Sequence, residues 1–240
     1  MNFINNSKNN FVKQKTLKKK ILFLGVGLHS GKAVSMSIEP SEPNTGIVFE
    51  RTDLNKNNLI KAIIDNVGET CLCTKIINKH GVSVSTIEHL MAAFQGLEID
   101  NVKVKINSDE LPALDGSSYV YVKKIIDSGV KVQSVNRKCI KILKKVQFCM
   151  NDRYISAEPS NELSLNISID YPNTIIGNSE FTYNHTQSNF LTQLSEARTF
   201  TLLEDVEKMR LTGYAIGGSI NNAIVVDKHK IINSDGLRFE

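Results

Sequence analysis

The chain has 240 residues, 41% of them hydrophobic and 22% charged, which is enough to bury a core in two domains of roughly 100–150 residues. Six lysines and no acidic residue lie within residues 1–20, so of the overall charge of +4 the rest of the chain carries −2. This excludes the basic surface of a typical nucleic-acid-binding protein. No apolar run reaches the roughly 18 residues of a membrane span, and no apolar secretory signal is present. We expect a cytoplasmic protein whose four cysteines are reduced thiols.

The first half predicts an α+β unit. Residues 1–13 are rich in asparagine and lysine and predict a disordered basic arm. Alternating apolar residues then predict strands, and the glycine-rich segment between the first two predicts a tight turn. The strands are expected near 21–23, 34–38, 46–51, 71–78, 81–85 and 101–106. Helices are expected from Ser85 or Thr86 to about Gln95, where Gly96 ends the pattern, and over 117–127.

The polar segment 128–138 marks a predicted domain boundary, which gives domains of 14–130 and 131–240. The second half predicts further strands, two helical segments and a final hairpin. These are expected at 139–147, 153–158, 163–169, 188–196, 203–212, 223–226 and 230–233. Ser234 and Asp235 resemble a helix N-cap, so residues 237–240 would be a first helical turn.

A short pattern occurs twice, as IINKH at 76–80 and VVDKH at 225–229. In each half it is followed by a predicted strand, so it indicates two related α+β units, although five residues can also match by chance. His80 and His229 would then lie at solvated hairpin tips.

The pair Glu88-His89 is the best candidate for chemistry. Histidine binds zinc through its neutral imidazole, and a neighbouring carboxylate can take a proton from water. The structural alternative is a capping box, in which Glu88 only accepts a hydrogen bond from the Ser85 backbone. From the local residues this alternative is favoured, because a catalytic zinc needs three protein ligands.

Of three other positions, two leave both a functional and a structural interpretation open, and Asp115 has a structural one only. His29 lies in the glycine-rich turn, where it can face a ligand or only solvent. Asp115 predicts a turn that caps the following helix. The Thr199 hydroxyl beside Phe200 could line a pocket, but a buried aromatic with a capping threonine is the usual arrangement.

Several strings in the chain together resemble one family, the zinc-dependent UDP-3-O-acyl-N-acetylglucosamine deacetylases of lipid A biosynthesis. They occur in family order over residues 14–240. The strings are GVGLHSG at 25–31, NTG at 44–46, RTDL at 51–54, LCT at 72–74, STIEHL at 85–90, GLEIDN at 96–101, DGS at 115–117, ARTF at 197–200, GGS at 217–219, AIVV at 223–226 and NSDGLRFE at 233–240.

The resemblance implies two related α+β domains whose helices pack between two mostly antiparallel sheets. It also implies hydrolysis of the N-acetyl group with Zn²⁺ as cofactor, in a monomer with at most peripheral membrane contact. His89 would be a zinc ligand, Glu88 the general base and Thr199 a donor to the oxyanion. Substrate contacts are implied at Leu72, Cys73 and Phe200 near the acyl chain, at Asp170 near the sugar nucleotide, and at His29 near the site.

In the family a second zinc-binding histidine, an aspartate four residues later and a further catalytic histidine follow the GLRFE string. They would lie beyond Glu240, so we expect a shortened chain with an incomplete second domain and no activity of its own. Two alternatives stay open. The chain could bind the sugar nucleotide or acyl chain without chemistry, or its lysine-rich arm could bind nucleic acid or an anionic membrane, which the acidic body disfavours.

Overall fold

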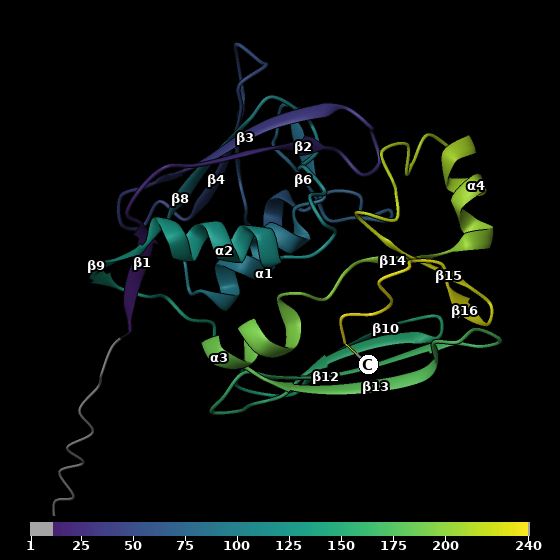
Figure 1. The fold of residues 1–240 in the computed structure, drawn as a ribbon. Coiled ribbons are helices and arrows are strands. Elements are labelled where there is room, and N and C mark those ends of the chain that lie inside the picture. Colours follow the sequence, from purple (N-terminus) through teal and green to yellow (C-terminus); the bar gives the residue numbers. More distant parts are fainter. Residues whose placement is uncertain (1–11, 240) are drawn as a thin grey trace, which may run out of the picture.

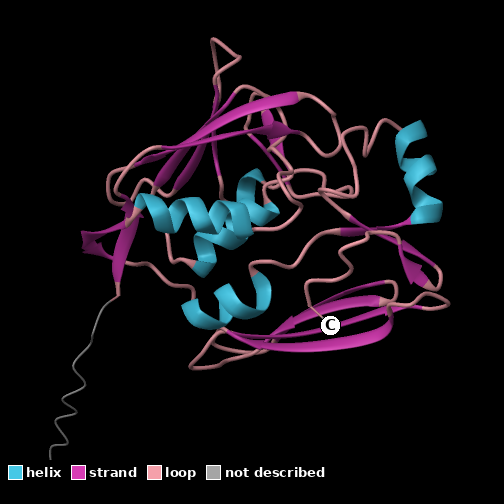
Figure 2. Ribbon diagram, in the orientation of Figure 1, coloured by secondary structure: helices cyan, strands magenta, loops and turns pink. Residues whose placement is uncertain are grey.

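The structure is a computed structural model that describes residues 12–239. The fold is α+β with mostly antiparallel sheets (Figures 1 and 2). The elements of the first half are β1 (Lys13–Leu17), β2 (Ile21–Val26), β3 (Ala33–Pro40), β4 (Ile47–Arg51), β5 (Leu59–Lys61), the 3₁₀ turn η1 (Ile64–Asn66), β6 (Lys75–Ile77), β7 (Ser83–Ser85), α1 (Glu88–Gly96), β8 (Val102–Ile106), α2 (Tyr119–Ser128) and β9 (Val130–Asn136). Those of the second half are β10 (Val146–Met150), β11 (Arg153–Ala157), β12 (Ser164–Tyr171), β13 (Gly177–Asn184), α3 (Gln187–Asn189), the π-helical turn η2 (Phe190–Leu194), β14 (Phe200–Leu202), α4 (Leu203–Leu211), β15 (Ile224–Asp227) and β16 (Lys230–Ile231).

A five-stranded sheet in the order β2-β3-β8-β4-β5 forms the base of the main core. Alternate residues of its strands, such as Phe23, Met36 and Val104, are buried, as a sheet with one covered face requires. Figure 1 shows α1 and α2 on one side of this sheet, where Phe94 and Tyr121 join the same core. The alternation of apolar and polar residues that predicted these strands therefore reflects a sheet with one face covered by the core.

The second half is built from smaller sheets. The hairpins β10–β11 and β12–β13 are separate two-stranded sheets, while β14, β15 and β16 form a third with a parallel β14–β15 pair. Apolar residues of β12 such as Ile167 remain exposed. The repeated pattern lies in hairpins at both places, β6–β7 and β15–β16, as expected.

Three local expectations were wrong, and one strand in the polar segment was missed. Helix α1 begins at Glu88, because Ser85 still belongs to β7 and Thr86 has a positive φ of 58°. The missed strand is β9, which lies in the polar segment of the predicted domain boundary and pairs with β1. Residues 139–145 contain no strand, and residues 234–239 form a turn instead of starting a helix. The expected disordered arm lies outside the described residues apart from its last two positions, and Lys13 already belongs to β1.

Among residues 12–239, no helix combines the length and the apolar character needed to cross a membrane. The cytoplasmic location stays a prediction.

Candidate functional site

Glu88 is the first residue of α1, and its side chain points to a neighbouring loop. The carboxylate oxygen Oε2 accepts a hydrogen bond of 2.9 Å from the backbone N–H of Thr74. The Ser85 backbone N–H donates to the Asp109 carbonyl instead. Glu88 is therefore not part of a capping box, and the structural alternative for this residue is wrong. Its carboxylate connects the start of α1 to the loop that carries Leu72 and Cys73.

His89 follows on α1 and is largely buried. Burial lowers the pKa of the imidazole below its ordinary value of 6.5, although the negative charges of Glu88 and Asp115 act in the opposite direction. At neutral pH the ring is therefore uncharged, which is the form that binds a metal. Between Val12 and Phe239, however, no three His, Cys, Asp or Glu side chains are close enough together to hold a metal ion. These residues do not by themselves make the three-ligand site that a catalytic zinc requires.

Leu72 and Cys73 lie on the loop that Glu88 holds. Leu72 has a positive φ of 57° and an exposed side chain. Burial raises the pKa of the Cys73 thiol above its ordinary value of 9.0, hydrogen bonding to Thr86 partly offsets this, and the charge of Glu88 raises it further. Cys73 is thus a protonated thiol beside the Glu88 carboxylate.

This environment predicts a difference in reactivity between two neighbouring cysteines. Alkylation needs the thiolate, and a raised pKa leaves less thiolate at pH 8. We expect iodoacetamide to modify Cys73 several-fold more slowly than the exposed Cys71. Peptide mass spectrometry over a time course measures both rates, with exposed Cys139 as the control. Equal rates at Cys71 and Cys73 would contradict this description of the loop.

The glycine-rich turn is held to the same region by the buried Glu110. Its carboxylate accepts hydrogen bonds from the backbone N–H groups of His29 and Ser30, at 2.7 and 2.8 Å, and from the Thr86 hydroxyl at 3.2 Å. Both ring nitrogens of His29 are buried and have no hydrogen-bond partner among the described residues. The ring instead meets the edge of Tyr214, with centroids 5.3 Å apart. Sequence reasoning missed Glu110, since nothing in its local pattern shows that an acidic residue is buried.

Thr199 and Phe200 lie where the second half meets the first. The Thr199 backbone N–H donates to the Gly116 carbonyl at 2.9 Å, and its own carbonyl accepts from Ile224 in β15 at 2.8 Å. Phe200 is 37% exposed and packs edge-on against Tyr171, 5.3 Å between centroids. Neither usual arrangement holds, because Phe200 is not buried and Thr199 does not cap α4, whose N-cap is Leu202.

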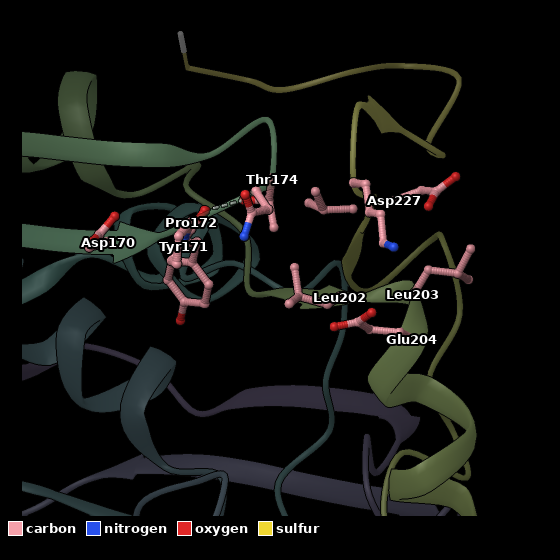
Figure 3. Close-up of a pocket in the computed structure, with 11 residues that line it drawn as sticks. Asp170, Tyr171, Pro172, Thr174, Leu202, Leu203, Glu204 and Asp227 are labelled. Carbon is pink, nitrogen blue, oxygen red and sulfur yellow. Dashed lines mark hydrogen bonds between the residues drawn. The ribbon is translucent and has the colours of Figure 1, made fainter.

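Asp170 lies at a cavity of about 490 Å³ at the end of β12 (Figure 3). Leu202, Glu204 and Asp227 line its other side. Of its charged lining groups only Lys228 is cationic, so the cavity suits hydroxyl or amide groups better than phosphate.

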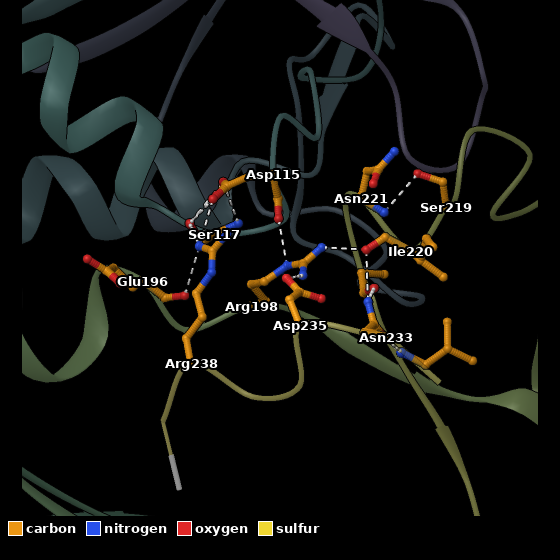
Figure 4. A network of polar contacts seen from close by, with 12 residues as sticks. Asp115, Ser117, Glu196, Arg198, Ser219, Ile220, Asn221, Asn233, Asp235 and Arg238 are labelled. Carbon is orange, nitrogen blue, oxygen red and sulfur yellow. Dashed lines mark hydrogen bonds and ion pairs between the residues drawn. The ribbon is translucent and has the colours of Figure 1, made fainter. Parts of the chain in front are cut away.

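Asp115 is the hub of a polar network (Figure 4). Its carboxylate accepts from the Ser117 hydroxyl at 2.9 Å and from Arg238 at 2.7 Å. Burial opposes the charged form, but these hydrogen bonds outweigh it and hold the pKa of Asp115 below 3.8. The expected cap of α2 is indirect, because the Ser117 hydroxyl, and not Asp115, accepts from the Tyr119 N–H.

The predicted site residues thus form three groups. Leu72 and Cys73 are joined to the Glu88-His89 pair at the start of α1, and His29 is connected to that region through Glu110. Thr199 forms the second group: its backbone N–H donates to the carbonyl of Gly116, and the neighbouring Asp115 carries the charge that acts on His89. Phe200 connects this junction to Tyr171, next to Asp170, at the cavity of the second half.

Comparison with known proteins agrees with the sequence motifs. Residues 14–240 match the model of the family described as LpxC, UDP-3-O-acyl N-acetylglycosamine deacetylase. Similar curated proteins, each named UDP-3-O-acyl-N-acetylglucosamine deacetylase, include those of Haemophilus influenzae strain PittEE, 41% identical, Pasteurella multocida, 40%, and Histophilus somni, 39%. Each match spans 231 residues, which is 95% of this chain and 76% of the relative. The chain belongs to the UDP-3-O-acyl-N-acetylglucosamine deacetylase family.

Proposed function

We propose that this protein contributes to hydrolysis of the N-acetyl group of UDP-3-O-acyl-N-acetylglucosamine, an early step of lipid A biosynthesis. The observation that carries the proposal, besides family membership, is the direction of the Glu88 side chain. Its carboxylate is used at the loop carrying Cys73 and not in a helix cap, and an uncharged imidazole follows it on the helix. A carboxylate and a neutral imidazole side by side suit activation of water for attack on an amide.

The roles that we propose for individual residues are those that the family resemblance implies. Glu88 takes the proton of the attacking water, and the Thr199 hydroxyl donates to the oxyanion that forms on the acetyl carbonyl. Leu72, Cys73 and Phe200 offer apolar surface to the acyl chain. Asp170 contacts hydroxyl groups of the sugar nucleotide, as the acidic character of its cavity favours. His29 contacts substrate from the glycine-rich turn.

Zn²⁺ is the proposed cofactor, with His89 as one ligand. Because residues 12–239 hold no group of three suitable side chains, we propose that the other two ligands come from outside this part of the chain and that residues 1–240 alone do not turn over substrate. We further propose that residues 14–130 and 131–240 are two related domains, that α1 and α2 lie between their sheets, and that the protein is a monomer with at most peripheral membrane contact.

The test compares two chains. One is residues 1–240, and the other is the same sequence continued by the segment that follows the matched region in the Haemophilus influenzae relative, here called the extended chain. We expect the extended chain to hold one zinc and to release acetate from UDP-3-O-acyl-N-acetylglucosamine, and residues 1–240 to do neither. Stoichiometric zinc and acetate release by residues 1–240 would contradict the metal proposal. No acetate release by a folded extended chain would contradict the function.

The cavity at Asp170 favours a second candidate, binding without chemistry. Calorimetric titration of residues 1–240 with the sugar nucleotide in the presence of a chelator tests it. Micromolar binding that Asp170→Asn weakens would support this candidate, and no binding would exclude it.

A further inference from the structure

A group of backbone and side-chain contacts converges on the turn formed by residues 115–118, directly before α2, which we call the 115–118 turn. Arg198 reaches it from the second half of the chain: its Nε donates to the Asp115 carbonyl at 2.9 Å. The same guanidinium donates from Nη2 to the Ile220 carbonyl at 2.8 Å, and Nη1 lies 3.5 Å from Asp235. Only 3% of the Arg198 side chain is exposed. One buried arginine therefore connects three segments (Figure 4).

Arg238 makes a second connection to the same turn. Its Nη1 donates to the Asp115 carboxylate at 2.7 Å and to the Glu196 carbonyl at 3.3 Å. Glu196 precedes Arg198 by two residues, so Arg238 fixes both sides of the junction. Both side chains of the Arg238–Asp115 pair are partly buried, 29% and 22% exposed.

The contacts fix Thr199 and the residue before it. Arg198 is held immediately before Thr199, and the Thr199 backbone bonds to Gly116 and to β15. A hydroxyl that must meet an oxyanion at hydrogen-bond distance needs a backbone fixed to a fraction of an ångström. The 115–118 turn, whose charge already acts on His89, is the part of the first half that supplies this fixed point.

We propose that Arg198 and Arg238 are positioning residues that clamp residues 196–200 to the 115–118 turn and so hold Thr199 at the reacting group. This inference rests on the proposed function for the role of Thr199, but the clamp itself concerns only this chain. The two arginines are not equivalent. Arg198 uses its planar fork on two carbonyls in different directions, which lysine cannot do, whereas Arg238 chiefly supplies a cation to Asp115, which lysine can do.

Hydrogen exchange of residues 1–240 tests the clamp without any turnover. The reporters are the amides of Thr199 and Ile224, and amides of the central strand β8 report global opening. We expect Arg198→Gln and Arg198→Lys to speed exchange at both reporters by about tenfold, and Arg238→Gln by roughly threefold, with β8 unchanged. Arg238→Lys is expected to stay within about twofold of the parent protein. The matched control is Arg153→Gln, because the Arg153 side chain is 84% exposed.

Unchanged exchange at Thr199 in both glutamine variants would overturn the clamp, and so would an equal rise at β8, which would mean a global effect. If Arg198→Gln does not fold, Arg238→Gln and Arg238→Lys still test the clamp, because Arg238 is partly exposed and its substitution is easier to tolerate. In the extended chain, Arg238→Gln is expected to lower kcat several-fold with KM within about twofold. A raised KM with unchanged kcat would overturn the link to the oxyanion. Failure of the extended chain to release acetate would instead contradict the proposed function and leave the exchange result standing.

Discussion

Glu88→Gln is expected to lower the turnover of the extended chain by roughly 10²–10⁴-fold, the usual contribution of a general base. The substitution is nearly isosteric, and the amide oxygen of glutamine can still accept the hydrogen bond from the Thr74 N–H. The loop that carries Cys73 therefore keeps its anchor. What is lost is the negative charge and the ability to take a proton. Acetate release measured under saturating substrate gives the effect on kcat.

The control for this variant is Glu42→Gln, which removes one carboxylate from an exposed turn. We expect its turnover to equal that of the parent chain. Both variants should unfold at the same urea concentration as the parent, since neither change removes a buried contact. If Glu88→Gln kept more than about a tenth of the parent turnover, Glu88 would not be the base.

The strands of the five-stranded sheet could be predicted because only one face of that sheet is covered. Phe23 and Met36 are buried while Leu22 and Ser35 beside them are exposed, and this alternation is visible in the sequence. Strand β13 was missed because its sequence, GNSEFTYN, has only Phe181 and Tyr183 as large apolar residues, which is too few to show an alternation. Its partner β12 is equally exposed, but its alternating apolar residues still marked it as a strand.

Local signals failed where long-range hydrogen bonds replaced them. Ser85 and Glu88 have the spacing of a capping box, but the Ser85 N–H bonds to Asp109 and the Glu88 carboxylate to Thr74. Strand β9 is polar and forms because β1, more than a hundred residues earlier, offers it an edge. Neither partner can be identified from nearby residues.

The candidate site also has a part that could be predicted from the sequence and a part that could not. Glu88 and His89 are adjacent in the sequence, and the motif strings pointed to both residues. The convergence of Arg198 and Arg238 on Asp115 could not be predicted, because these contacts join residues 83 and 123 positions apart. Charge alone marks nearly a quarter of the chain, so it could not select these two arginines.

Gly116→Ala is expected to lower the free energy of unfolding by roughly 2–5 kcal/mol, the sum of backbone strain and overpacking. Gly116 has a φ of 82°, a conformation that side chains other than glycine rarely adopt. A Cβ added there would also overlap the backbone carbonyl oxygen of Asn222. Because that neighbour is backbone, it cannot rotate away, and the second half would have to move from the 115–118 turn.

Gly81→Ala separates the two causes. Gly81 has nearly the same φ, 81°, but no atom lies within 4 Å of an added Cβ. Both substitutions also reduce the freedom of the unfolded chain equally, so that contribution cancels in the comparison. We expect Gly81→Ala to cost only the strain, about 1–2 kcal/mol, measured by urea unfolding of residues 1–240. Equal losses of unfolding free energy in the two variants would mean that the structure near Asn222 relaxes to accept the added Cβ at no energetic cost. A larger loss at Gly116, with faster exchange of the Thr199 amide, would locate the cost at the junction that carries Thr199.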